Sequence, residues 1–152
     1  MLDPIVKTID VPCSQEQAFT VFVNNINSWW PRDKNSVSAM QGEVAQEILL
    51  EPRLGGAVIE IGHDDTRHRW GTVTHYDPFG SIAIDWHINM PAEQASRVGV
   101  TFETLDENTT RVELTHSNWE VFGDSAADMR AGYDGGWVGV FEQAYRAACS
   151  TA

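Results

Sequence analysis

Apolar and polar side chains alternate along the start of the chain and again along most of its middle. In residues 5–11 the odd-numbered side chains, all but one of them apolar, fall on one side. Such alternation predicts a strand, because successive side chains of a strand point to opposite faces. From residue 43 to residue 119, shorter runs with a similar period are separated by turns rich in Gly, Pro, Asp and Asn, which favours an antiparallel meander. The six strands predicted there span residues 44–50, 57–61, 67–76, 81–88, 97–105 and 110–116.

The residues after the first strand have helical spacing instead. Pro12 ends the strand, and Ser14 followed by Gln17 forms a capping box. Apolar residues then recur at three- and four-residue intervals, and a second short turn leads into Trp29-Trp30-Pro31. The sequence therefore predicts two short helices here, followed by a polar, irregular segment over residues 32–42.

Near the C-terminus the chain has the pattern of a long helix with one apolar face. Gly132 and Gly135-Gly136 interrupt this pattern, so we predict that the helix runs from about Gly136 to Ala148. Further upstream, Ser125 and Asp128 give only a weak cap signal. The apolar face consists of Trp137, Phe141, Ala144, Tyr145 and Ala148.

These elements define an α+β fold class. A sheet with one polar face must bury its other face against another element, and the C-terminal helix is the only large apolar element left for this. We therefore predict a curved antiparallel β-sheet wrapped around a long C-terminal α-helix, with two short helices after the first strand. No composition shift or linker divides the chain, so residues 1–152 are expected to form a single domain.

The formal net charge of −12 narrows the range of partners. A surface this acidic repels phosphate backbones and anionic membranes. Nucleic acid is therefore excluded as a binding partner, and membrane insertion is not expected. The N-terminus lacks the features of a signal peptide, and no segment approaches the roughly 20 apolar residues needed to span a bilayer. We therefore expect a cytoplasmic protein in which Cys13 and Cys149 are reduced and unpaired.

His116 is the first ionisable residue that stands out within an apolar strand. By strand parity it points inward with Val112 and Leu114, as does Trp86 on a neighbouring strand. The chain has six Trp residues, and clusters of Trp often line cavities or interfaces. An inward His in such surroundings could orient a ligand or move a proton, or it could be a core histidine satisfied by one partner.

Glu60 is the second such residue. It faces inward if Val58 does, and a buried carboxylate then needs a partner. If Ile59 and Ile61 face inward instead, Glu60 is an ordinary surface residue.

The chain lacks the motifs of most other site chemistries. The histidines form no HxH or HExxH pattern and no cysteine pair accompanies them, so no metal is expected. No GxSxG sequence is present, and the Gly-Gly pairs are not followed by GKS or GKT, so neither a serine nucleophile nor a phosphate loop is indicated. No cofactor is predicted. The histidines are His63, His68, His75, His87 and His116.

A series of short motifs runs almost from end to end of the chain. They are Ala18-Phe19 with Trp29-Trp30-Pro31; Glu51-Pro52-Arg53-Leu54-Gly55-Gly56 with Glu60; Trp70-Gly71 with Val73 and Asp77-Pro78; Trp86; Thr110-Arg111-Val112-Glu113-Leu114-Thr115-His116; and Gly136-Trp137. In their order and spacing they resemble the START-like superfamily, which includes the birch-pollen-allergen-like proteins and the polyketide cyclases. Within it, the chain resembles the branch named after the activator of the 90-kDa heat-shock chaperone's ATPase.

This resemblance implies the helix-grip fold, and it bears on the site. The family's Gly-Gly-x-x-x-Glu spacing corresponds to Gly55, Gly56 and Glu60, which implies that Glu60 faces inward. It also adds Trp70, on an adjoining strand, to the residues found by parity and helix spacing. The predicted ligand-binding residues, expected to surround one internal cavity, are Glu60, Trp70, Trp86, His116, Trp137 and Phe141.

Three functions follow from this interpretation. The favoured one is binding of a small hydrophobic or amphipathic molecule between sheet and helix, without chemistry, by a monomer or homodimer. The first alternative is an enzyme of the cyclase or lyase type that uses His116 and Glu60 for proton transfer. The second alternative, implied by the resemblance, is an interaction domain that activates a chaperone ATPase. Fold alone does not decide among them.

Overall fold

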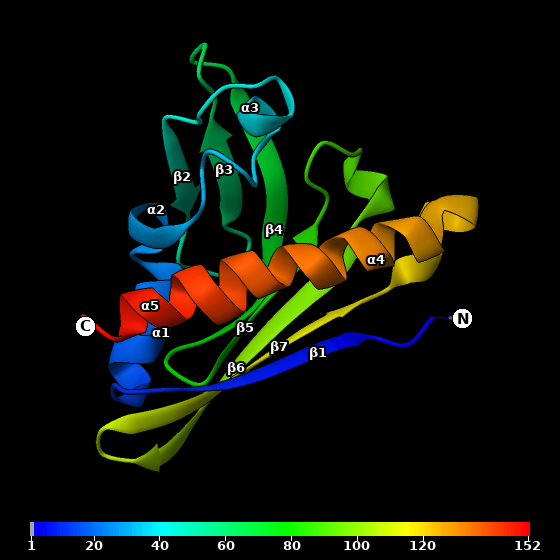
Figure 1. The fold of residues 1–152 in the computed structure, drawn as a ribbon. Helices are drawn as coiled ribbons and strands as arrows, with labels where there is room; N and C mark the ends of the chain where they lie inside the picture. The colour runs from blue at the N-terminus through cyan, green and yellow to red at the C-terminus, as the bar shows by residue number, and fades with distance from the viewer. Residues whose placement is uncertain (1) are drawn as a thin grey trace.

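The computed structural model describes residues 2–152, and its centre is a seven-stranded antiparallel sheet (Figure 1). The strand order is β1-β7-β6-β5-β4-β3-β2, so β2 to β7 form the predicted meander and β1 pairs with β7. The α+β helix-grip fold predicted from the sequence is confirmed. The strands are β1 (Ile5–Val11), β2 (Glu47–Leu50), β3 (Ala57–Ile61), β4 (Arg67–Asp77), β5 (Ser81–Trp86), β6 (Ser96–Asp106) and β7 (Thr109–Ser117).

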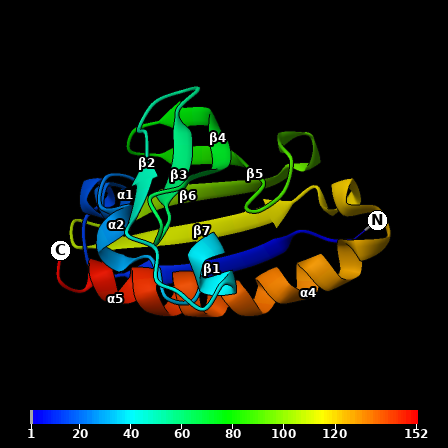
Figure 2. The ribbon, with the colours of Figure 1, turned by 90° about the horizontal axis from the view of Figure 1, so that it is seen from above.

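The helices fall into two groups. Between β1 and β2 lie α1 (Gln15–Val23), α2 (Ile26–Trp29) and α3 (Val37–Met40). A short 3₁₀ turn, η1 (Ala92–Gln94), precedes β6. After β7 the chain forms the 3₁₀ segment η2 (Trp119–Ser125), then α4 (Ala126–Trp137), the π-helical stretch η3 (Val138–Tyr145) and α5 (Arg146–Cys149). From α4 to α5 the helix is continuous and runs alongside β1 (Figure 2).

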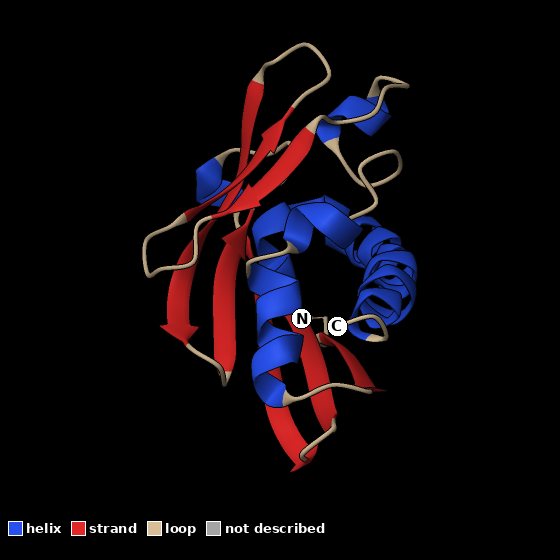
Figure 3. Cartoon of the chain, turned by 90° about the vertical axis from the view of Figure 1, so that its left-hand side faces the viewer, coloured by secondary structure: helices blue, strands red, loops and turns tan. Residues whose placement is uncertain are grey.

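The core lies between the concave face of the sheet and this C-terminal helix (Figure 3). The inward side chains of β5, β6 and β7 are those predicted by parity, and all are buried. The predicted strand 81–88 was too long, because β5 ends at Trp86 and Ile88 is half-buried in the loop that follows. From the helix, Trp137, Phe141 and Tyr145 are at most 3 % exposed, so the predicted apolar face does pack on the sheet. The capping box of Ser14 and Gln17 is also present at the start of α1.

Two helical predictions need correction. The C-terminal helix begins at Ala126, not near Gly136, and continues through Gly132, Gly135 and Gly136. Glycine lowers helix stability by about 1 kcal/mol relative to alanine but does not forbid a helix, and packing of the neighbouring side chains outweighs this cost. Ser125 occupies the N-cap position, but its side chain makes no capping hydrogen bond.

The segment predicted to be irregular contains α3, because Ser36 caps it by accepting a hydrogen bond from the backbone N–H of Ala39 at 2.9 Å. The strand predicted from residue 44 begins at Glu47. The residues expected to begin this strand bind a side chain from another segment: the Arg32 guanidinium donates to the carbonyls of Ala45 and Gln46 at 3.2 and 2.6 Å.

The two cysteines, distant in sequence, meet where the end of α5 packs beside the end of β1. Both are free, buried thiols, and each lies within hydrogen-bonding reach of the other. Burial raises the pKa of the Cys13 thiol and raises that of the Cys149 thiol to about 12. Both thiols are therefore protonated at neutral pH, in keeping with a packing role in the core.

Candidate functional site

A pocket with a volume of about 430 Å³ opens between the C-terminal helix, the loop that follows β5 and the segment that leads into α3. Its deepest walls are aromatic: Trp30, Trp86 and Trp137 all line it, and Tyr133 closes one side. Volume and lining match the usual make-up of small-molecule sites, which are largely apolar with a few polar groups.

The three pocket tryptophans pack against one another. Ring centroids are 5.9 Å apart for Trp30 and Trp86, 6.1 Å for Trp30 and Trp137, and 5.8 Å for Trp86 and Trp137. Trp70 lies behind them, 5.3 Å from Trp30 and 5.8 Å from Trp86. Such distances are those of favourable aromatic pairs, so the wall is supported from behind by further ring contacts.

One face of the helix forms the opposite wall. Its pocket-lining positions follow helical spacing and include two glycines, Gly132 and Gly136. A Cβ atom added at Gly132 would meet nothing within 4 Å, and one at Gly136 would meet only Asn35 Nδ2, at 4.0 Å. The missing side chains at these positions therefore contribute to the open volume. The lining residues of this face are Met129, Gly132, Tyr133, Gly136, Trp137 and Val140.

The pocket wall also contains flexible and polar side chains. Met40, Met90 and Met129 contribute thioethers, which adapt easily to ligands of irregular shape. Lys34 and Asp128 are exposed residues of the lining and bring one charge of each sign. An amphipathic molecule could thus bury its apolar part against the rings and keep a polar end near this rim.

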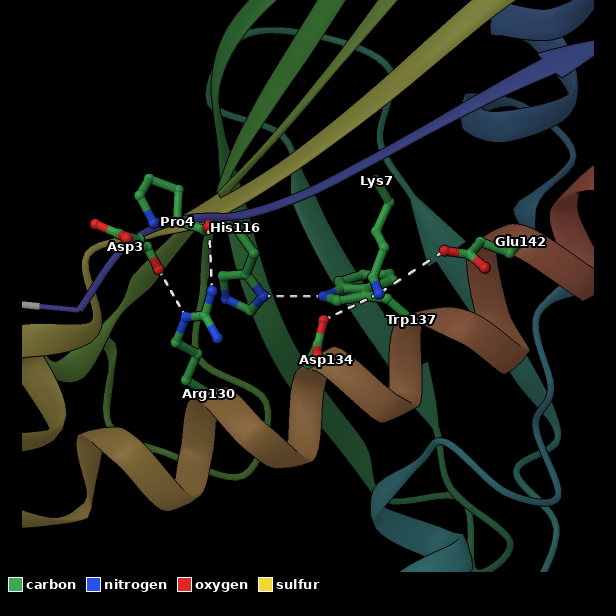
Figure 4. A network of polar contacts seen from close by, with 8 residues as sticks. All are labelled: Asp3, Pro4, Lys7, His116, Arg130, Asp134, Trp137 and Glu142. Atoms are coloured by element: carbon green, nitrogen blue, oxygen red, sulfur yellow. Dashed lines mark hydrogen bonds and ion pairs between the residues drawn. The ribbon is translucent and has the colours of Figure 1, made fainter.

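His116 lies behind the pocket wall and is fully buried (Figure 4). Its Nδ1 accepts a hydrogen bond from Trp137 Nε1 at 3.0 Å, and its Nε2 lies 2.7 Å from Ser96 Oγ. Because Nδ1 is an acceptor, the neutral ring carries its proton on Nε2 and donates to Ser96. The Ser96 hydroxyl then donates to the carbonyl of Trp86 at 3.2 Å.

This arrangement fixes the charge state of His116. Burial lowers its pKa to about 3, so the ring is neutral at physiological pH. Both ring nitrogens are occupied by protein partners, and His116 is not among the residues that line the pocket. Its evident contribution is to orient the Trp137 indole.

Glu60 is buried as well, which confirms that it faces inward. Its Oε1 accepts hydrogen bonds from the Val37 backbone N–H at 2.7 Å and from Trp70 Nε1 at 3.2 Å. Its Oε2 accepts from the backbone N–H and the hydroxyl of Ser38, at 3.0 and 2.7 Å. The three bonds from Val37 and Ser38 fasten α3 to β3, and the bond from Trp70 links β3 to β4. Because α3 carries Met40 into the pocket wall, Glu60 supports that wall from behind.

The six residues predicted from sequence thus occupy different layers. Trp86 and Trp137 line the pocket, and Trp70 packs behind them. Glu60 and His116 each bind one of these indoles and do not reach the pocket wall. Phe141 lies farther along the helix, stacked on Tyr145 with centroids 5.6 Å apart. The structure does not bring all six around one cavity.

Sequence reasoning missed Trp30 and Tyr133. Trp30 stood in a recognised motif, but nothing in the local pattern indicated where its ring would point. Tyr133 precedes Trp137 by four residues and so shares its helical face. Extending the predicted helix through the glycines would have found Tyr133.

Ion pairs hold this pocket-lining helix to β1 (Figure 4). Lys7, on the inward face of β1, lies 2.9 Å from Asp134 and 3.8 Å from Glu142. The Lys7 ammonium lowers the pKa of the Asp134 carboxyl. One turn earlier, Arg130 donates to the backbone carbonyls of Asp3 and Pro4 at 2.7 and 3.3 Å. Two turns of α4 are therefore anchored, one to β1 and the other to the residues just before it.

Within residues 2–152, no helix is both long and apolar enough to cross a membrane. The same residues hold no group of three or more His, Cys, Asp or Glu side chains placed to bind a metal ion.

Comparison with known families shows to which family the chain belongs. Residues 12–143 match the profile of the family described as "Activator of Hsp90 ATPase homolog 1-like protein". The protein therefore belongs to this family, and the resemblance inferred from the motifs is confirmed. No curated protein sequence matches the chain.

Several solved structures share the fold. An anthrahydroquino-gamma-pyrone synthase, Txn09, determined in complex with SUM, is 25% identical and covers 97% of each chain with a TM-score of 0.67. CalC, a self-sacrificing resistance protein from Micromonospora echinospora, is 22% identical over 98% of this chain and 95% of its own, with a TM-score of 0.69. The Aha1 dimer from Colwellia psychrerythraea is 19% identical over 87% and 88%, with a TM-score of 0.59. The last two comparisons concern the fold alone.

Proposed function

We propose that this protein binds a small hydrophobic or amphipathic molecule in the pocket between sheet and C-terminal helix, in one domain. The observation that carries the proposal is the 430 Å³ pocket walled by Trp30, Trp86, Tyr133 and Trp137. Burial of apolar ligand surface against these rings supplies the affinity, at roughly 25 cal/mol per Å² removed from water before the costs of association are subtracted.

The shape of the site favours a flat ligand. Aromatic rings present broad, flat faces, and three indoles line one side of the pocket. On the opposite side, two glycines without side chains leave room for a ligand. A planar ring system contacts such walls over both faces. The structural relative at 25% identity is named for a synthase of an anthrahydroquino-gamma-pyrone, a name that describes a fused aromatic product. That name supports an aromatic ligand for this chain too.

Titration with the neutral fluorescent probe N-phenyl-1-naphthylamine tests the proposal. We expect saturable binding of one probe per chain, with enhanced probe emission and energy transfer from the pocket tryptophans. Met90→Asp places a charge in the pocket wall and should weaken binding at least tenfold. Leu54→Asp, at a residue that is 68 % exposed in the β2–β3 turn, is the matched control and should bind as the parent does.

Absence of saturable binding by the parent would contradict the proposal. Equal binding by the Met90→Asp and Leu54→Asp variants would place the probe somewhere other than this pocket. Near-ultraviolet circular dichroism of each variant confirms that the aromatic core is intact before either result is interpreted.

An enzymatic function is the second candidate, favoured by the synthase named among the structural relatives. The predicted proton-transfer pair is poorly suited to it, because Glu60 and His116 are occupied by protein partners and do not line the pocket. Ionisable residues of the lining itself, Lys34, Asp128 and Tyr133, are the alternatives. If the protein is an enzyme on an aromatic substrate, Tyr133→Phe should lower kcat while His116→Asn leaves its pH profile unchanged.

Activation of a chaperone ATPase requires a surface for a large protein, whereas our proposal rests on a small pocket. We therefore do not assign it to this chain. The monomeric or homodimeric state and the cytoplasmic location stay predictions.

A further inference from the structure

The indole N–H groups of the tryptophans differ in one respect. Five of the six donate a hydrogen bond to a protein acceptor at 2.7 to 3.2 Å. Trp86 Nε1 is buried and has no such partner within residues 2–152. A buried N–H without an acceptor is costly, by about 1–3 kcal/mol, and is rare in native proteins. Trp86 is also one of the residues that line the pocket, so a bound ligand is a candidate for the missing acceptor.

A second donor lies beside it. Tyr133 also lines the pocket, and its hydroxyl lies next to Trp86 Nε1, although the two atoms do not meet the usual geometric limits of a hydrogen bond. Burial raises the pKa of Tyr133 to about 12, while the adjacent Trp86 side chain acts to lower it. The hydroxyl is therefore protonated at neutral pH and close to the indole N–H. Trp86 comes from the end of β5 and Tyr133 from α4, so the two approach from opposite walls.

We propose that Trp86 Nε1–H and the Tyr133 hydroxyl together bind one neutral acceptor oxygen of the ligand, a carbonyl conjugated to a planar aromatic ring system. This inference rests on the proposed function and specifies its ligand class. A carbonyl oxygen has two lone pairs, so it accepts both hydrogen bonds at once. Its attached rings then lie among Trp30, Trp86 and Trp137.

The surroundings favour a neutral oxygen over an anionic one. The aromatic rings packed against Tyr133 are those of His116, Trp119 and Trp137. Lys34, the cationic residue of the pocket lining, is exposed to water at the rim. His116 is neutral because its Nδ1 accepts a hydrogen bond from the Trp137 indole and so carries no proton, and it has no charge to offset an anion. The chain as a whole has a net charge of −12, which further disfavours a bound anion.

The other tryptophan donors cannot replace Trp86. Trp30 Nε1 donates to the carbonyl of Asn35 at 2.7 Å, and Trp137 Nε1 donates to His116 Nδ1 at 3.0 Å. Both lie in the pocket wall, yet both N–H groups point to protein acceptors. Trp86 is thus the one pocket indole, among the described residues, whose N–H has no protein acceptor.

Two probes of nearly identical shape test the proposal. Fluorene and 9-fluorenone share the same three fused rings, but only fluorenone carries a conjugated carbonyl oxygen. The parent should bind fluorenone on the order of tenfold more tightly than fluorene, because two hydrogen bonds are gained. Trp86→Phe and Tyr133→Phe each keep an aromatic ring and remove one donor. Each should lower this preference about threefold, with little effect on fluorene.

A spectroscopic measurement accompanies the affinities. The carbonyl stretch of bound fluorenone should move to lower frequency in the parent, and part of that shift should be lost in each variant. Tyr133→Phe alone suffices if Trp86→Phe fails to fold. Leu54→Asp, at an exposed residue of the β2–β3 turn outside the pocket lining, is the control and should keep both the preference and the shift.

The outcomes separate this inference from the proposed function. If all proteins bind fluorene and fluorenone equally, or if the variants retain the parent's preference, the two-donor site is refuted while the apolar pocket stands. If the parent binds neither probe and also fails to bind N-phenyl-1-naphthylamine, the proposed function itself fails and the inference falls with it.

Discussion

Filling the pocket from the helix side should stabilise the protein and abolish its binding at the same time. Gly135 and Gly136 are neighbours on α4, but only Gly136 lines the pocket. A Cβ at Gly136 would lie 4.0 Å from Asn35 Nδ2, an ordinary contact, and one at Gly135 would meet nothing within 4 Å. Replacing either residue therefore introduces no clash, and the pair provides a matched comparison.

The magnitudes follow from helix propensity and burial. Alanine at either position should raise the free energy of unfolding by about 0.5–1 kcal/mol, because both glycines sit within a regular helix. This corresponds to an increase in Tm of roughly 1–4 °C for a chain of this size. Leucine at position 136 should raise the free energy of unfolding by roughly 1–2 kcal/mol more, because its side chain is buried against the aromatic wall and shields that wall from water. Leucine at 135 points to solvent and should add little.

The assay combines urea unfolding with titration of N-phenyl-1-naphthylamine. We expect Gly136→Leu to lose probe binding at least tenfold while gaining stability, and Gly135→Leu to bind as the parent does. Opposite changes in stability and binding at one position are the behaviour expected of a residue kept small for function.

Equal probe binding by the two leucine variants would refute the reasoning, because it would mean that the volume beside Gly136 is not used. A loss of stability in both alanine variants would refute the other half, namely that these glycines cost the helix free energy in the parent.

Three further predictions concern the layers behind the pocket. Burial lowers the pKa of His116 from 6.5 to about 3, so below pH 6.5 the unfolded chain binds a proton that the folded chain does not bind. The free energy of unfolding should therefore fall by about 1.4 kcal/mol per pH unit from pH 6.5 downward. Urea melts at pH 7 and pH 5 should show a smaller fall for His116→Asn than for the parent. Glu60→Gln replaces one acceptor oxygen by an NH₂ group that faces protein donors, and it should lower the free energy of unfolding by about 3 kcal/mol in the same melts. Glu47→Gln, on the outer face of β2, should lower it by less than about 0.5 kcal/mol. Phe141→Ala should cost about 3–5 kcal/mol as a buried aromatic truncation, and a variant as stable as the parent would contradict its place in the core.

Much of the fold could be predicted because its information is local. The alternation in residues 5–11 marks β1 with its observed bounds, and the capping box of Ser14 and Gln17 marks the start of α1. The start of β2 could not be predicted, since it depends on the Arg32 guanidinium reaching across from another segment. The early start of the C-terminal helix was missed because local propensity penalises glycine, whereas tertiary packing decides.

The site was harder to predict than the fold. Strand parity correctly predicted that Trp86 and His116 face the interior, but interior positions include both the pocket wall and the layer behind it. Which of the two a side chain joins depends on hydrogen-bond partners from distant segments, such as Ser96 for His116 and α3 for Glu60. The free donor of Trp86 is likewise a property of its neighbours in space, so no sequence pattern could have revealed it.

The pairing of β1 with β7 has a consequence for synthesis on the ribosome. Ile5 pairs with His116, so the first strand has no partner until nearly all of the sheet has been translated, a delay on the order of ten seconds. The helix that covers the concave face is made later still. For the last interval of translation the nascent chain therefore holds a nearly complete sheet whose apolar inner face is uncovered, and this is the stage at which it is most exposed to aggregation and most in need of a holding chaperone.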